Sequence, residues 1–176
     1  MNSPSRSSAW LALASLLVLA ACGYSAGTGL HARGIRTVHL RAIENDTYRQ
    51  RLEAELFAAV SRELPVSSDL LPGTLERADA ILDLRITTER EQTLVVGNPK
   101  DTTAPPEAQA PTLEGAQQVR VHVLLTDRRT GKKLVDKTVL DRAEFRSTLD
   151  EDLTTARQEL VADLARKIVL ALESSF

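Results

Sequence analysis

The sequence predicts an α+β domain in which two helices pack on one face of a mostly antiparallel sheet of about four strands. Residues 48–64 and 153–172 repeat apolar side chains every three or four positions, which is the helical period. Four other segments alternate apolar and polar side chains, as half-buried strands do: 35–43, 80–89, 118–126 and 134–145. The apolar face of a sheet and the apolar stripe of a helix are both buried when the two pack together. The order strand-helix-strand-strand-strand-helix therefore predicts both helices on one sheet face.

Residues 1–21 predict a lipoprotein signal peptide. The only basic side chain in this stretch is Arg6, and the apolar run after it is much shorter than the roughly 20 residues that a spanning helix needs. Small residues end the run directly before Cys22, the only cysteine. This ending resembles the lipobox of bacterial lipoproteins, which implies cleavage before Cys22 and a covalent lipid on its sulfur. The alternative is an ordinary signal peptide with a chance cysteine.

Residues 22–34 are rich in Gly, Ser and Thr, and predict a lipidated tether ahead of a single domain at 35–176. Gly23 follows the cysteine, and by the sorting habit of lipoproteins this favours the outer membrane, with the domain facing the periplasm. The formal net charge of −2 offers no overall basic excess for nucleic acid. Aromatic residues make up only 3% of the chain, so the core has to be aliphatic and base-stacking platforms are not expected.

The first elements follow from local signals. After the strand at 35–43, Asn45 and its neighbours supply turn and cap chemistry. The helical period begins at Tyr48, and Pro65 is expected to end it. A loop at 66–73 follows, in which Leu70 and Leu71 suggest a short edge strand. The strand at 80–89 has the clearest alternation of the chain.

The second half begins with a connection at about 93–117 that carries four prolines and predicts a flexible loop. The strands at 118–126 and 134–145 are joined by a hairpin turn in which Gly131 supplies positive φ. Alternation in the second of them is imperfect, and a bulge would reconcile it. Thr148 and Glu151 predict a capping box before the last helix.

The strand alternation leaves a broad polar face opposite the helices. We call it the docking face, and it is a candidate surface for a hydrated partner wall, such as the interior of a protein pore. An ordinary solvated sheet face is the alternative. The same alternation also assigns Asp83 and Glu89 to this side. The residues of the docking face are Thr37, His39, Arg41, Arg85, Thr87, Arg120 and His122.

No motif for catalysis or metal binding is visible. The chain lacks a Gly-rich phosphate loop, a Gly-x-Ser-x-Gly elbow and a His-Glu-x-x-His pair. His39 and His122 could lie on neighbouring strands, but no cysteine or trio of carboxylates accompanies them, so a zinc site is not expected. We therefore expect no enzyme, no metal and no cofactor beyond the covalent lipid.

In its order of motifs the chain resembles the LptE family of lipopolysaccharide-assembly lipoproteins. The resemblance covers nearly all of the chain after the signal peptide. It is carried by Cys22-Gly23-Tyr24, by residues 35–40 with Asn45, by residues 78–84, by residues 119–127 with Thr130-Gly131, and by the final helix near the C-terminus.

The resemblance implies two helices on a four-stranded sheet. It also implies a plug inside the outer-membrane barrel LptD that delivers lipopolysaccharide to the cell surface. Lipopolysaccharide phosphates would need a basic cluster. The candidate cluster lies at the hairpin turn. The alternative is that these side chains belong to an ordinary solvated turn and bind nothing. The members of the cluster are Arg128, Arg129, Lys132 and Lys133. The competing function is an auxiliary lipoprotein of an ABC-type lipid transporter, and a periplasmic enzyme is a third class.

Overall fold

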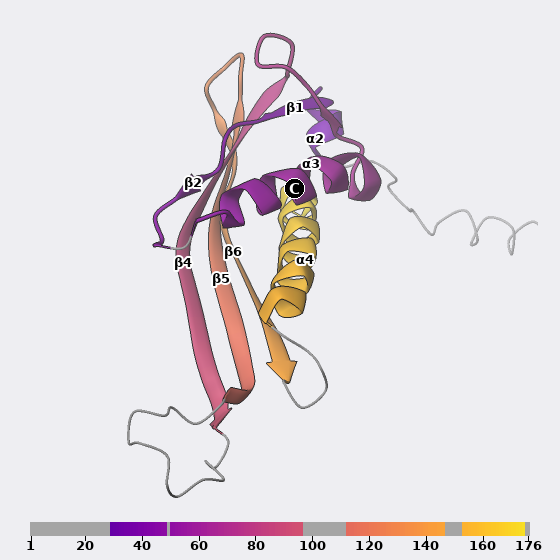
Figure 1. The fold of residues 1–176 in the computed structure, drawn as a ribbon. Helices are drawn as coiled ribbons and strands as arrows, with labels where there is room; N and C mark the ends of the chain where they lie inside the picture. Colours follow the sequence, from indigo (N-terminus) through magenta and orange to yellow (C-terminus); the bar gives the residue numbers. More distant parts are fainter. Residues whose placement is uncertain (1–28, 49, 97–111, 147–152, 175–176) are drawn as a thin grey trace, which may run out of the picture.

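A computed structural model describes residues 29–48, 50–96, 112–146 and 153–174. In these ranges the chain forms two layers, with helices α3 (Leu52–Ser67) and α4 (Leu153–Glu173) against one face of a mixed sheet (Figure 1). The predicted α+β class and the two helices on one face are confirmed. A third, short helix, α2 (Gly29–Ala32), precedes the first strand.

The sheet is built on three long antiparallel strands, β4 (Ala80–Val96), β5 (Thr112–Asp127) and β6 (Lys133–Arg146). Three short strands complete it: β1 (Thr37–Leu40), β2 (Glu44–Asn45) and β3 (Leu71–Pro72). The described strands thus number six, in the order β3-β1-β4-β5-β6 with β2 also on β4. The short strands pair in parallel, because α3 carries the chain back before β4 begins.

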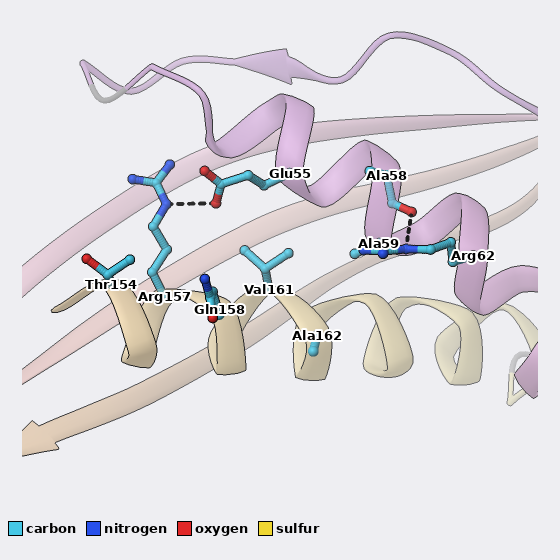
Figure 2. Close-up of a pocket in the computed structure, with 9 residues that line it drawn as sticks. All are labelled: Glu55, Ala58, Ala59, Arg62, Thr154, Arg157, Gln158, Val161 and Ala162. Atoms are coloured by element: carbon cyan, nitrogen blue, oxygen red, sulfur yellow. Dashed lines mark hydrogen bonds and ion pairs between the residues drawn. The ribbon is translucent and has the colours of Figure 1, made fainter. Parts of the chain in front are cut away.

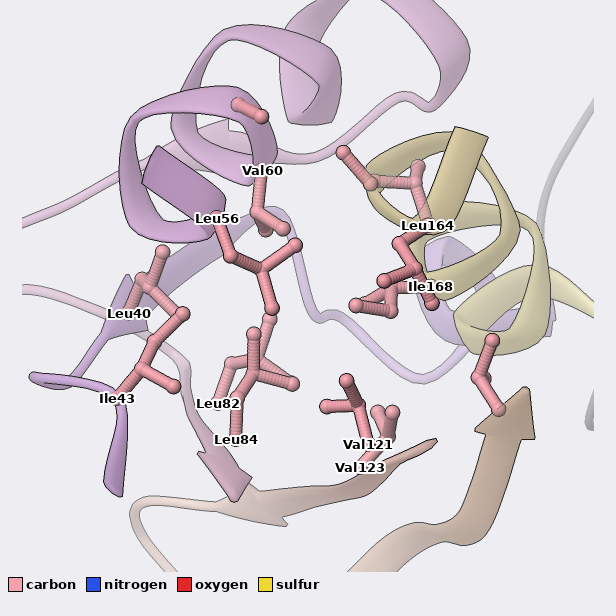
Figure 3. Packing of buried hydrophobic residues seen from close by; sticks show 14 of the residues in the cluster. Leu40, Ile43, Leu56, Val60, Leu82, Leu84, Val121, Val123, Leu164 and Ile168 are labelled. Atoms are coloured by element: carbon pink, nitrogen blue, oxygen red, sulfur yellow. The ribbon is translucent and has the colours of Figure 1, made fainter. Parts of the chain in front are cut away.

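The core between the layers is aliphatic, as the composition predicts. Figure 3 shows Leu82 and Leu84 of β4 and Val121 of β5 directed toward Leu56 of α3 and Leu164 of α4. All of these side chains are at most 2% exposed. The predicted stripe of α4 is also buried, at Ala156, Leu160, Leu164, Ile168 and Leu172, while Leu153 is partly buried.

Helix α3 differs from the prediction at both ends. It begins at Leu52, and Tyr48, which was expected to start its apolar stripe, is fully exposed. Asn45 Oδ1 accepts hydrogen bonds from Thr47 N (2.9 Å) and Thr47 Oγ1 (2.7 Å), so it stabilises the preceding turn and caps no helix. At the other end the helix continues past Pro65 to Ser67. Ser68 Oγ donates to Leu64 O at 2.5 Å just beyond the last helical residue.

The folded part of the chain starts earlier than the predicted domain. Of the tether predicted at 22–34, residues 29–32 form α2, and its Leu30 is fully buried in the core. Of the flexible loop predicted at 93–117, residues 93–96 belong to β4 and residues 112–117 to β5. Residues 97–111, Cys22 and the capping box lie outside the described residues.

Candidate functional site

The docking face is formed by every second residue of neighbouring strands. Its residues lie between buried ones: Val38 and Leu40 on β1, Leu84 and Ile86 on β4, and Val121 and Val123 on β5 point to the helices. The side chains between them therefore project from the opposite face. Arg85, Thr87 and Arg120 are exposed, whereas Thr37, His39 and His122 are half-buried. The structure thus brings these predicted residues to one face.

At the β1 side of this face, polar side chains are fixed by hydrogen bonds. Asp79 Oδ2 accepts from Arg36 N (3.0 Å), Thr37 N (2.9 Å) and Thr37 Oγ1 (2.8 Å). The Arg36 backbone hydrogen bond is the main reason that the pKa of Asp79 lies below its usual range. His39 Nδ1 lies 3.0 Å from Gly73 O. Thr37 and His39 are thereby held in place rather than left free to rearrange.

Two arginine–carboxylate ion pairs occupy the centre of the face. Arg41 Nη1 lies 3.1 Å from Asp83 Oδ1, and Arg85 pairs with Glu44. With His122, these four side chains line a shallow hollow of about 370 Å³. The four side chains of the two pairs are between 34% and 63% exposed, so each pair adds little to stability. What they provide is a fixed pattern of charge on a hydrated surface.

His122 continues the pattern toward β6. Its Nε2 lies 2.8 Å from Asp136 Oδ1, and Lys133 Nζ donates to Asp136 Oδ2 at 2.9 Å. The hydrogen bond from Lys133, followed by the one from His122, keeps the pKa of Asp136 below its usual range. Asp136 was not singled out from the sequence, because the mixed alternation of its strand hid which face it occupies.

A bulge in β4 corrects one further assignment. The pairing moves from Ile86 opposite Val121 to Thr88 opposite Arg120, so Thr87 is the extra residue. Beyond this point the faces exchange, and Glu89 pairs with the buried Val119 on the helix side. Glu89 therefore does not belong to the polar face, contrary to the alternation read from the sequence.

The helix side contains polar contacts that the sequence did not predict. Gln117, fully buried, donates through Nε2 to Glu89 Oε1 at 2.6 Å. Lys167 Nζ of α4 lies 2.6 Å from Asp141 Oδ1 of β6, whose side chain is only 9% exposed. A groove between α3 and α4 is bridged by Arg157 Nε and Glu55 Oε2 at 2.9 Å (Figure 2).

The hairpin turn has the predicted chemistry. Gly131 adopts φ 69°, and its N donates to Asp127 O at 2.8 Å. Asp127 Oδ1 accepts from Arg129 N (2.8 Å) and Thr130 N (2.9 Å), and the Thr130 backbone hydrogen bond is the main cause that lowers the pKa of Asp127. The four basic side chains of the predicted cluster are all exposed here: Arg128, Arg129, Lys132 and Lys133.

The described residues were also examined for metal sites and for membrane-spanning helices. These residues hold no cluster of three or more His, Cys, Asp or Glu side chains arranged for a metal ion. Among their helices, none is both long and apolar enough to cross a membrane.

No protein-family model and no curated protein matches this chain. Solved structures do share its fold. The hypothetical protein CT253 from Chlamydia trachomatis is 14% identical, with a TM-score of 0.55 over 80% of this chain and 96% of that one. Protein XCC0632 from Xanthomonas campestris, of family DUF330, is 9% identical, with a TM-score of 0.58 over 80% and 85%.

A third structure with this fold is the uncharacterized lipoprotein B from Nitrosomonas europaea. It is 10% identical, with a TM-score of 0.50, and the match covers 80% of this chain and 83% of that one. At such identities the likeness shows the fold alone. The chain thus has the fold of a group of bacterial α+β domains that includes a lipoprotein.

Proposed function

We propose that the chain is a lipid-anchored outer-membrane protein that faces the periplasm and acts as plug and assembly partner of an LptD-like β-barrel in lipopolysaccharide transport. The observation that carries this proposal is the docking face, which is broad, mainly polar and of mixed charge, with Leu124 and Leu140 among its polar residues. Partner surfaces of this kind are wet and specific, since complementary charges select the partner and fix its orientation. The wall of a hydrated pore is such a surface.

The lipid anchor is supported by two independent features. The sequence places small residues before and after its only cysteine, Cys22. In addition, the fold is shared with lipoprotein B from Nitrosomonas europaea. A non-catalytic role and contact of the hairpin cluster with lipopolysaccharide remain predictions of the same proposal.

The partner is tested by capture from the native membrane. The tagged chain is purified from gently solubilised outer membranes, and the proteins that accompany it are identified by mass spectrometry. We expect a large β-barrel in stoichiometric amount and an acylated N-terminal peptide at Cys22. Inner-membrane transporter subunits in its place would favour the auxiliary lipoprotein of an ABC-type system. A free monomer or an unmodified Cys22 thiol would contradict the proposal.

A matched pair of variants tests the docking face itself. Arg120→Glu reverses one exposed charge of the docking face, and Arg62→Glu makes the same change on the exposed side of α3. Neither residue is part of the core, so both variants are expected to melt like the parent chain. Arg120→Glu should reduce barrel capture at least tenfold, because it leaves an unmatched charge in the interface. Equal capture by the two variants would show that another face meets the barrel.

A further inference from the structure

Helix α2 and the β5–β6 hairpin lie at the same end of the molecule (Figure 1). Six basic residues in and next to these two segments are exposed. A hollow of about 570 Å³ joins the two segments, with Arg33 on one side and Arg128 and Arg129 on the other. Arg36 belongs to the same place, because Asp79 accepts from Arg36 N through its side chain and from Arg128 N through its carbonyl oxygen. We call this set the basic end: Arg33, Arg36, Arg128, Arg129, Lys132 and Lys133.

Carboxylates at this end offset only part of the positive charge: Asp79 and Asp127 line the hollow, where they interact electrostatically with Arg128 and Arg129. The carboxylates of Asp79 and Asp127 are directed to backbone N–H groups, as described above. The guanidinium of Arg128 donates through Nε to a backbone carbonyl, that of Ala78, at 2.6 Å. Of the four hairpin cations, Lys133 is the one with a carboxylate contact given by the structure, to Asp136.

The other end of the sheet is arranged differently. There, arginines pair with glutamates across and along the strands: Arg142 Nη2 lies 2.8 Å from Glu144 Oε1, and Arg146 Nε lies 3.9 Å from Glu114 Oε1. Positive charge is therefore concentrated at one end of a chain whose formal net charge is −2.

The length of the chain brings the basic end close to a bilayer. Six residues, 23–28, separate Cys22 from Gly29, where α2 begins. Even a fully extended chain of this length spans at most about 25 Å. A lipid on Cys22 therefore holds the start of α2 within that distance of the membrane surface, and the hollow that α2 shares with the hairpin brings Arg128 and Arg129 to the same region. This step rests on the proposed function, since it needs the acylated cysteine.

We propose that the basic end lies on the leaflet that holds the anchor and contacts the phosphates of its anionic phospholipids. Guanidinium groups bind phosphate in a bidentate manner, and the attraction acts over a screening length of about 8–10 Å in physiological salt. Basic residues next to a lipid anchor supply a second signal that strengthens attachment. The contact also orients the domain, with the hairpin at the membrane and the distal ends of β4 and β5 pointing away from it.

The test measures how close the hairpin lies to lipid headgroups. The processed chain carrying Thr130→Cys is purified from its membrane, where acylation leaves this new cysteine as the only free thiol, and a fluorophore is attached. It is reconstituted into phosphatidylcholine vesicles with or without phosphatidylglycerol, each containing a headgroup-spin-labelled lipid as quencher. We expect quenching to be several-fold stronger with phosphatidylglycerol and to fall as salt is raised.

Charge-reversal variants show whether the quenching depends on the basic end or on electrostatic attraction of the whole protein to anionic vesicles. Arg129→Glu with Lys132→Glu should abolish the additional quenching, whereas the matched pair Arg62→Glu with Arg90→Glu, exposed elsewhere, should preserve it. Equal quenching on both vesicle types, or no effect of the hairpin reversal, would overturn the inference. The inference would also be overturned if lipopolysaccharide added to phosphatidylcholine vesicles increased the quenching and phosphatidylglycerol did not.

The proposed function and this inference fail in different ways. Loss of the headgroup contact in a chain that is acylated and still captures the barrel overturns only the contact. An unmodified Cys22 overturns both. Headgroup contact without any barrel partner supports the inference and contradicts the plug.

Discussion

Asp79 connects three parts of the chain that are distant in sequence. Its carboxylate accepts hydrogen bonds from Arg36 N, Thr37 N and Thr37 Oγ1, and its backbone carbonyl accepts from Arg128 N. It thereby fixes the start of β1 beside β4 and the hairpin. The sequence placed Asp79 at the opening of a strand, but it contained no signal for these partners, because they lie about 40 residues or more away.

Replacement of Asp79 by Asn should reduce stability in a pH-dependent way. The folded protein lowers the pKa of this carboxyl from its ordinary 3.8, so it favours the ionised form. The stabilisation is therefore complete above pH 3.8 and is lost as the pH falls through the folded pKa. Near neutral pH we expect a loss of about 1 kcal/mol in the free energy of unfolding, measured with urea. Below pH 3.8 the difference from the parent chain should shrink, and a constant difference would contradict this account.

At the scale of elements, the sequence predicted best where one period runs uninterrupted. Strand β5 and helix α4 alternate or repeat cleanly, and the predicted inward residues are buried apart from Leu153, which is partly buried. Helix α4 also buries Val161, Ala165 and Val169, which were not part of the predicted stripe. Strand β6 was ambiguous because Lys137 and Asp141 interrupt the apolar side chains of its helix-facing row. The predicted bulge exists: the pairing shifts between Leu125 and Thr126, which leaves Leu134 as the extra residue. The bulge in β4 was not predicted, because Thr87 and Thr88 both suit a strand.

The pair between α4 and β6 should behave as a unit. Lys167→Met leaves the Asp141 carboxylate, 9% exposed, without its cation, and should cost about 2 kcal/mol of unfolding free energy. Adding Asp141→Leu removes the buried charge as well and should restore most of that loss. Urea unfolding of both single variants and the double variant measures the coupling. A double variant as unstable as the sum of the two single changes would show that the pair is not coupled.

For the whole molecule, the two layers do not have the same length. The helices cover the part of the sheet where Leu82, Leu84 and Ile86 are at most 2% exposed. The distal ends of β4 and β5 extend beyond α4 (Figure 1), and residues 91–95 of β4 are exposed. This extension was not predicted, since the prolines between residues 99 and 111 suggested that a loop began near residue 93.

Amide hydrogen exchange should report this difference along a single strand. We expect the amides of Leu84 and Ile86 to exchange only through global unfolding, because they lie beneath the helices. Those of Glu91 and Gln92 should exchange through local opening, since ladder hydrogen bonds with little apolar cover break independently of the core. Uniform protection along β4 would show that the exposed part is as stable as the covered part.

The terminal strands of the sheet also bear on self-association. The order of strands in the sheet ends at β3 on one side and at β6 on the other. Strand β3 has only two residues, and one of them, Pro72, has no N–H group. Strand β6 carries charged side chains along its length: Lys133, Asp136, Lys137, Asp141, Arg142, Glu144 and Arg146. Short strands, proline and charge all discourage the addition of a further strand. Two copies of this domain are thus poorly suited to pair with each other through β3 or β6.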